Sequence, residues 1–326
     1  MNKPAYNILA TLTLLASACG QRAPQAPTAV RVGTNRALGT VAPYVARGKG
    51  LFRAHGVDVQ IVDFADGSPM EAFAAGELDI ALLGVAPSAI WQSRGVGLKV
   101  VAGASGGGHV LLTRSGAGIN QLADLRGRKV AAPKPGTVTD TLFRSHILKD
   151  LAGLNPEKDL QILPGVAAAD IPAALFVSRE VDAAITWEPF ASQAEATYRD
   201  AKVLFDASAQ WRKSNPGAAH LYAVNVVIAR QGFIDGRPED LRRFLAAYAE
   251  TIEFLNGSPL EANRIIAKEI QVEPAIVASA RRRIDYTFQV DAAADLQTLG
   301  WSTQAGYLKQ APVAAALFDL RYLPHP

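Results

Sequence analysis

The chain has 326 residues, and its 33 lysines and arginines nearly balance 30 aspartates and glutamates, which leaves a formal net charge of +3. This length exceeds that of a typical single domain and favours two lobes. The basic residues are scattered, and the tightest cluster, Arg281-Arg282-Arg283, lies on a predicted helix, where a solvated face is expected. The composition therefore gives no support for nucleic-acid binding.

The first 18 residues have the layout of a secretory signal. Lys3 supplies a positive charge, residues 8–15 form an apolar run that is too short to span a bilayer, and three small residues follow. Cys19, the only cysteine in the chain, comes next in a stretch that resembles a bacterial lipobox, with Ala16 where leucine is commoner. We expect residues 1–18 to be a signal peptide and Cys19 to be lipidated. The alternative is an ordinary signal with a chance cysteine nearby.

Lipidation of Cys19 would anchor the protein at a membrane and would leave no free cysteine in the mature chain. Residues 19–29 are rich in alanine, proline and glutamine and are predicted to form a flexible tether. The protein is then exported and lipid-anchored at the periplasmic or cell-surface face of a bacterial membrane. No disulfide can form within the mature chain, so its stability must come from an apolar core.

From residue 30 onward, strand and helix signals alternate. Ser68-Pro69-Met70-Glu71 combines a capping serine, a first-turn proline and a glutamate that can bond back, so it predicts the start of a helix. The strands predicted in this half span 31–34, 57–64, 79–83 and 98–102, and helices span 41–54 and 86–94. Alternation of this kind indicates a largely parallel α/β sheet.

The same alternation restarts after Thr113. Strands are predicted at 129–132, 160–163, 181–185 and 203–205, with helices at 137–151 and from about 171 and 189. Residues 77–81 (ELDIA) are echoed by 180–184 (EVDAA), each followed by a proline a few residues on. The echo favours two related lobes, although five matching positions can also arise by coincidence.

Long helices follow an apolar run at 222–229, and they are predicted at 238–256, 259–269 and 274–284. We expect them to complete the first lobe after the chain crosses back. The predicted first lobe thus comprises 30–112 and 223–326, and the second comprises 113–222.

Five segments carry a resemblance to a known family, and they are 49–52 (KGLF), 55–59 (HGVDV), 75–79 (AGELD), 122–131 (LADLRGRKVA) and 186–190 (TWEPF). In this order they resemble the periplasmic substrate-binding proteins of ABC importers for nitrate, taurine and aliphatic sulfonates, a group that includes binders of thiamine-precursor pyrimidines. The resemblance implies an α/β, two-lobed type II periplasmic-binding-protein fold with a central cleft. Ligands of open α/β sheets bind beyond the carboxyl ends of the strands, which agrees with such a cleft.

Two loops that follow strands of the first lobe are expected to face the cleft. Asn35 can donate and accept hydrogen bonds, and Arg36 can pair with an anion, although a solvated arginine is an equally simple interpretation. Gly84 permits close backbone approach at the start of a helix, and Ser88 lies in the same turn. We predict that these four residues bind the ligand.

Two loops of the second lobe complete the predicted site. Thr137 and Thr139 offer hydroxyl groups at a helix start, where Asp140 is expected to serve as a capping residue. Trp187 can stack on a ligand or pack in the core, and Glu188 can accept from a ligand or cap a helix. These carboxylates favour a ligand that has donor groups as well as an anionic group.

No catalytic arrangement stands out in the sequence. None of the five histidines has a metal-ligand spacing, and neither a nucleophile elbow nor a phosphate loop occurs. We therefore predict a monomeric binding protein, without catalytic residues, metal or cofactor, that passes its ligand to an ABC permease and its ATPase. The expected ligand is a small organic anion or zwitterion of the sulfonate, taurine or nitrate kind. The alternatives are a pyrimidine thiamine precursor as ligand, a sensory module, or an exported enzyme on the same scaffold.

Overall fold

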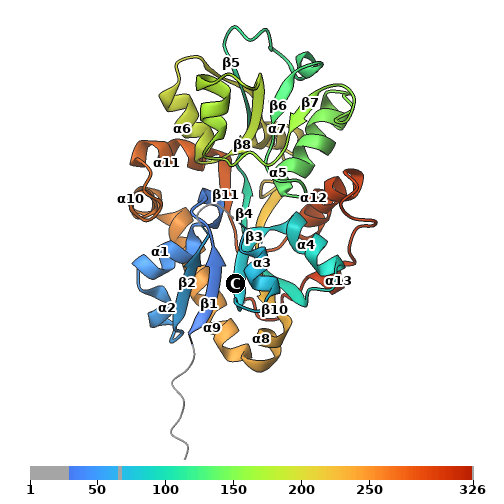
Figure 1. Ribbon diagram of the computed structural model, residues 1–326. Coiled ribbons are helices and arrows are strands. Elements are labelled where there is room, and N and C mark those ends of the chain that lie inside the picture. The colour runs from blue at the N-terminus through green and yellow to red at the C-terminus, as the bar shows by residue number, and fades with distance from the viewer. Residues whose placement is uncertain (1–28, 65–67, 325–326) are drawn as a thin grey trace, which may run out of the picture.

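A computed structural model describes residues 29–64 and 68–324. The predicted signal peptide, Cys19 and nearly all of the predicted tether lie outside the described residues. The described chain forms two α/β lobes, each built on one sheet, with the lower lobe of Figure 1 holding the first strands of the chain. The predicted α/β fold class is confirmed.

The first lobe contains a six-stranded sheet with the order β11-β4-β10-β3-β1-β2. Its strands are β1 (Val30–Thr34), β2 (Val59–Asp63), β3 (Ile80–Gly84), β4 (Leu98–Gly107), β10 (Ala223–Arg230) and β11 (Ile284–Tyr286). β1 runs parallel to β2 and β3, whereas β10 runs antiparallel to β3 and β4.

The second lobe contains a five-stranded sheet with the order β7-β6-β8-β5-β9. Its strands are β5 (His109–Arg114), β6 (Lys129–Ala131), β7 (Gln161–Leu163), β8 (Ala183–Trp187) and β9 (Ala201–Asp206). β6 is parallel to β7 and β8, and β5 lies antiparallel between β8 and β9. In each sheet, then, an antiparallel strand arrives from the other lobe, β10 in the first sheet and β5 in the second, and β11 adds a further antiparallel edge strand to the first sheet. This shared order accounts for the sequence echo, because the two echoed segments lead into β3 and β8.

Helices cover both sheets. Those of the first lobe are η1 (Leu38–Thr40), α1 (Ala42–Gly48), α2 (Leu51–Ala54), α3 (Met70–Ala74), α4 (Val85–Ser93), α8 (Gln231–Gly236), α9 (Pro238–Gly257), α10 (Pro259–Ile270), α11 (Pro274–Ala280), η5 (Arg281–Arg283), α12 (Ala292–Gln304) and α13 (Ala314–Leu317). Those of the second lobe are η2 (Leu122–Leu125), α5 (Val138–Thr141), the π-helical turns η3 (Leu142–Leu151) and η4 (Ala173–Val177), α6 (Phe190–Thr197) and α7 (Ala207–Ser214).

The residues of the hydrophobic core recur at helical spacing along the longer helices. In α9, Leu241, Phe244 and Tyr248 recur at helical spacing and are buried against the first sheet. In η3, Phe143 and Ile147 are buried, whereas Leu151 at the end of the helix is 40% exposed. The reason is that the π-helical turn shifts the last residues away from the regular period.

The chain crosses between the lobes at a run of glycines. β4 continues to Gly107, five residues beyond the predicted strand, and β5 begins at His109 in the other sheet. The boundary expected after residue 112 therefore falls inside β5. Periodicity could not detect this connection, because glycines interrupt the apolar pattern of both strands. β11, α7 and α12 were also not predicted.

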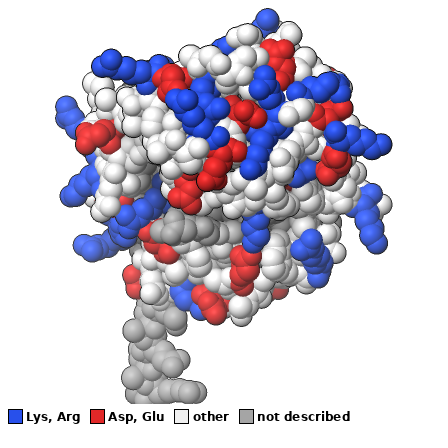
Figure 2. All heavy atoms as spheres, turned by 45° about the horizontal axis from the view of Figure 1, so that its top comes forward, with Lys and Arg blue, Asp and Glu red and all other residues white. Residues whose placement is uncertain are grey.

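Helix α12, the last long helix described, lies beside both lobes. It packs on α4 of the first lobe and on η3 and α5 of the second, and Figure 1 shows it at the junction. On the face shown in Figure 2, basic and acidic side chains are interspersed, so no large area of one sign covers it. Among the described residues, no helix is both long and apolar enough to span a membrane.

Candidate functional site between the lobes

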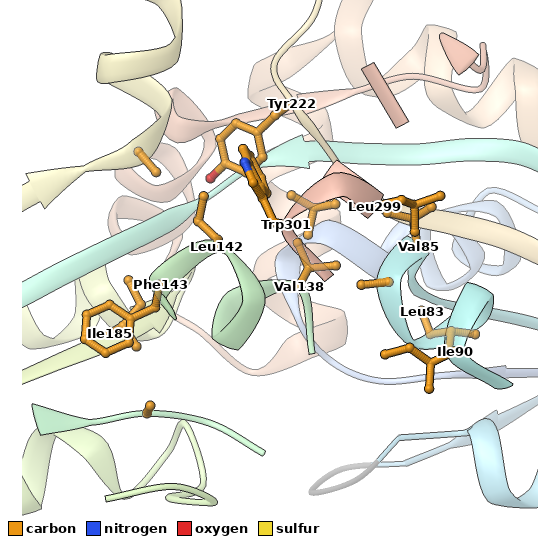
Figure 3. Packing of buried hydrophobic residues seen from close by; sticks show 14 of the residues in the cluster. Leu83, Val85, Ile90, Val138, Leu142, Phe143, Ile185, Tyr222, Leu299 and Trp301 are labelled. Atoms are coloured by element: carbon orange, nitrogen blue, oxygen red, sulfur yellow. The ribbon is translucent and has the colours of Figure 1, made fainter. Parts of the chain in front are cut away.

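The turns after β3 and β6, which were predicted to face the cleft, meet across the junction of the lobes. A Cβ atom added to Gly84 would lie 3.0 Å from Val138 Cγ2, so a side chain at this position would push the two turns apart. Figure 3 shows Val85 and Ile90 of α4 on one side, with Val138 and Leu142 on the other. The lobes therefore contact each other through apolar side chains at these turns.

The two predicted residues after β1 both have local partners. Asn35 Oδ1 accepts hydrogen bonds from the Ala37 N–H at 3.1 Å and from the Thr40 hydroxyl at 2.6 Å. Arg36 Nε donates to Asp63 Oδ2 at 2.6 Å, and Tyr44 donates to the other oxygen of the same carboxylate at 2.9 Å. The positive charge of Arg36 is thus already paired within the first lobe.

The predicted hydroxyl groups mostly serve helix starts. Ser88 is buried and donates to the Gly84 carbonyl oxygen at 2.8 Å. Thr137 donates to the Lys134 carbonyl and accepts the Asp140 N–H at 3.3 Å, so it is the N-cap of α5. Thr139, in the first turn of α5, is 5% exposed.

Asp140 is a structural residue of this turn, as expected. Its fully buried carboxylate accepts from the Gly136 N–H at 3.0 Å, from Arg144 Nε at 2.8 Å and from the Tyr307 hydroxyl at 2.7 Å. Tyr307 belongs to the C-terminal segment, so this carboxylate ties that segment to the second lobe. Because these three donors already bind its oxygens, Asp140 does not need a ligand.

Glu188 lies at the centre of an ion cluster that joins the lobes. It accepts from Arg283 Nη1 at 2.7 Å and from the Ser192 N–H, in the first turn of α6, at 3.0 Å. Arg283 binds two further carboxylates of the second lobe, Glu195 and Asp206, both at 2.7 Å. Burial raises the pKa of Glu188.

The expectation that the arginine triplet is a solvated face is wrong for Arg283, whose side chain is 17% exposed. The error arose because its three carboxylate partners lie 77 to 95 residues away along the chain. Trp187, the neighbour of Glu188, is half-buried and packs edge-on against Phe190 at 6.0 Å.

An aromatic cluster surrounds the two chain crossings. His109 Nδ1 lies 2.9 Å from the Tyr222 hydroxyl, and Tyr222 also contacts Trp211 and Trp301. Figure 3 shows Tyr222 beside Trp301 of α12. Complete burial lowers the pKa of His109 to about 3, so its imidazole is neutral at physiological pH. No local sequence pattern indicated this cluster.

A cavity of about 80 Å³ lies next to these crossings. Its walls come from β4, from a segment around Trp211 and His220 together with β10 that follows it, and from the residues that lead from β11 into α12. The polar side chains that line it are Ser105, His220, Asn225, Thr287, Gln289, Asp291 and Asp295. Sequence reasoning missed all of them, because the three segments are far apart in the chain.

Asp295 is the least satisfied of these polar groups. Its side chain is 2% exposed in total, and its Oδ1 has no hydrogen-bond partner in the described part of the chain. Burial, together with the charge of Asp291, raises the pKa of Asp295 to about 7. Within residues 29–64 and 68–324, no three histidine, cysteine, aspartate or glutamate side chains gather as a metal site would require.

Two sheets of matching order, joined by two crossings with a cavity beside them, define a periplasmic-binding-protein fold. Solved structures agree: the ligand-binding component of an ABC-type import system from Staphylococcus aureus superposes with a TM-score of 0.76 at 14% identity, covering 90% of this chain and 97% of that one. The periplasmic aliphatic sulphonate-binding protein of Escherichia coli gives 0.72 at 22% identity, covering 90% and 98%. The nitrate-binding protein of Synechocystis PCC 6803 gives 0.72 at 16%, covering 86% and 82%.

The chain belongs to the NMT1/THI5-like family, whose model matches residues 40–262. A protein of Brucella abortus (strain 2308) that is named as a binding protein is 29% identical to this chain over 241 residues. The match covers 73% of this chain and 70% of that protein. The predicted family resemblance is confirmed.

Proposed function

We propose that this protein is an extracytoplasmic solute-binding protein that captures a small polar molecule between its lobes and delivers it to an ABC importer. The observation that carries the proposal is the cavity beside the double crossing, because its walls include both the first sheet and the Trp211–His220 segment. Family membership and the names of the relatives support the same role. The proposed lobes follow the sheets, with the first crossing at Gly107-Gly108 and the return at β10.

Transport requires the lobes to open and close around the solute. A ligand that touches both lobes favours the closed form, since only that form makes both sets of contacts. The junction at Gly84 and Val138 and the Arg283 cluster hold the lobes together in the state described here. The importer's permease would then recognise the closed shape.

Two ligand classes follow from the residues and the relatives. Sulfonates and nitrate are suggested by the structural neighbours, and taurine by the family resemblance. The proposed contacts for them in an opened cleft remain Asn35, Arg36, Gly84, Ser88, Thr137, Thr139, Trp187 and Glu188. A pyrimidine or another molecule rich in N–H donors is favoured by the buried carboxylate of the cavity, Asp295. The second class agrees better with the pairing of Arg36 to Asp63.

A ligand panel tests the solute-binding function. We expect one of nitrate, bicarbonate, taurine, alkane sulfonates or aminopyrimidines to stabilise the protein, by about 2.7 kcal/mol at 100 times its dissociation constant. Thermal unfolding identifies the ligand, and small-angle scattering should then show a smaller radius of gyration than that of the free protein. A saturating ligand that leaves the distribution of open and closed forms unchanged would argue against lobe closure.

Membrane anchoring depends on Cys19 in this proposal. Cys19→Ser should move the protein from the membrane fraction to the soluble fraction, because the lipid on Cys19 is the proposed anchor and the described residues contain no membrane-spanning helix. Fractionation of cells expressing the two forms measures this. Retention of the Cys19→Ser protein in membranes would contradict lipid anchoring and leave the solute-binding function untouched.

A further inference from the structure

The cavity contains a carboxylate that folding alone does not explain. Asp295 is 2% exposed, lines the cavity and leaves Oδ1 without a partner among the described residues. Burying a charged or polar group without a hydrogen bond destabilises a fold, and native structures contain few such groups. An apolar residue at this position in α12 would pack without that cost.

The rest of the cavity wall offers acceptors and apolar surface. The Asn225 side-chain N–H group is bonded to Ser105 Oγ at 3.0 Å, which leaves its Oδ1 as an acceptor. Trp211 Nε1 donates to the His220 carbonyl at 3.1 Å, so the indole presents mainly apolar surface. No lysine or arginine is among the described residues that line this cavity. An anionic group would therefore lie beside the buried Asp295 carboxylate, with no lysine or arginine among the described lining residues to attract it.

The size of the cavity limits what it can hold. Its volume of about 80 Å³ is close to half that of an engineered apolar cavity of roughly 150 Å³ that admits benzene. It is therefore suited to one functional group of a larger molecule.

We propose that Asp295 binds an N–H-bearing group of the transported solute, such as an amine, an amidine or an amino-heterocycle, inside this cavity. The inference rests on the proposed solute-binding function and adds the residue and the chemical group that it recognises. Asp295 Oδ1 accepts one N–H, and Asn225 Oδ1 lies in the same cavity as a second acceptor. A sulfonate or nitrate group is then bound elsewhere or not at all.

Matched pairs of small molecules test this recognition. Calorimetry compares taurine with ethanesulfonate, and 4-aminopyrimidine with pyrimidine, since the members of each pair differ in the amino group. We expect an amino-bearing member to bind at least about 10-fold more tightly than its partner, and Asp295→Asn to weaken it about 10- to 100-fold. Equal binding within both pairs, including no binding at all, would overturn the inference, as would unchanged affinity in Asp295→Asn.

A neighbouring carboxylate supplies the control. Asp291 also lines the cavity but is exposed, so Asp291→Asn should change affinity less than about 3-fold. In urea at pH 8, Asp295→Asn should unfold at a higher denaturant concentration than the wild type, because it removes a buried charge. Weaker binding with greater stability separates a binding residue from a structural one. A donor-free ligand that binds independently of Asp295 would overturn this inference while the solute-binding function stands.

Discussion

Replacing Arg283 with methionine is expected to lower the free energy of unfolding by about 3–5 kcal/mol. The guanidinium is the cation shared by Glu188, Glu195 and Asp206, and the Glu188 side chain is 0% exposed. Methionine keeps much of the apolar stem but leaves three neighbouring carboxylates unpaired, one of them fully buried. Urea unfolding of the wild type and the variant measures the loss.

The adjacent arginine provides a matched control. Arg282 is exposed and donates to Ser279 Oγ at 2.8 Å, so Arg282→Met should change the free energy of unfolding by less than about 0.5 kcal/mol. Adding Glu188→Gln to Arg283→Met should restore part of the stability, because the buried carboxylate is then gone. Similar losses for both single variants would mean that the cluster does not hold the lobes together.

Gly107→Ala is expected to destabilise the protein by about 3 kcal/mol, through backbone strain and overpacking together. Gly107 has a φ of 76°, in the left-handed region where a residue with a Cβ atom is strained. A Cβ atom here would also lie 2.5 Å from both the Arg283 carbonyl oxygen and Ser208 Oγ, and would overlap Leu221. Thermal and urea unfolding both measure the effect.

A glycine with the same backbone but open surroundings isolates the steric part. Gly116 has a φ of 84°, and nothing lies within 4 Å of a Cβ atom built on it. Gly116→Ala should therefore cost only about 1 kcal/mol, from the left-handed backbone alone. The difference between the two variants measures how tightly the crossings pack. Equal losses at Gly107 and Gly116 would show that this packing is loose.

The local signals of the chain determined the fold class and the order of its elements. Alternating strands and helices, the echo of 77–81 in 180–184 and the capping pattern at Thr137 and Asp140 all depend on residues within a few positions of one another. Such contacts are set by backbone geometry, so sequence periodicity and spacing reveal them. The five family segments added the two-lobed architecture, because each is a short local pattern that can be recognised in the sequence.

The tertiary structure alone decided which polar groups meet. Arg283 and Arg282 are indistinguishable by sequence, yet one lies among three carboxylates of the other lobe and the other is exposed. The cavity likewise combines β4, the Trp211–His220 segment and Asp295, which are brought together only by the order of strands in the first sheet and by the packing of α12. Electrostatic pairing depends on distance in space, and no local pattern encodes a partner that lies 95 residues away.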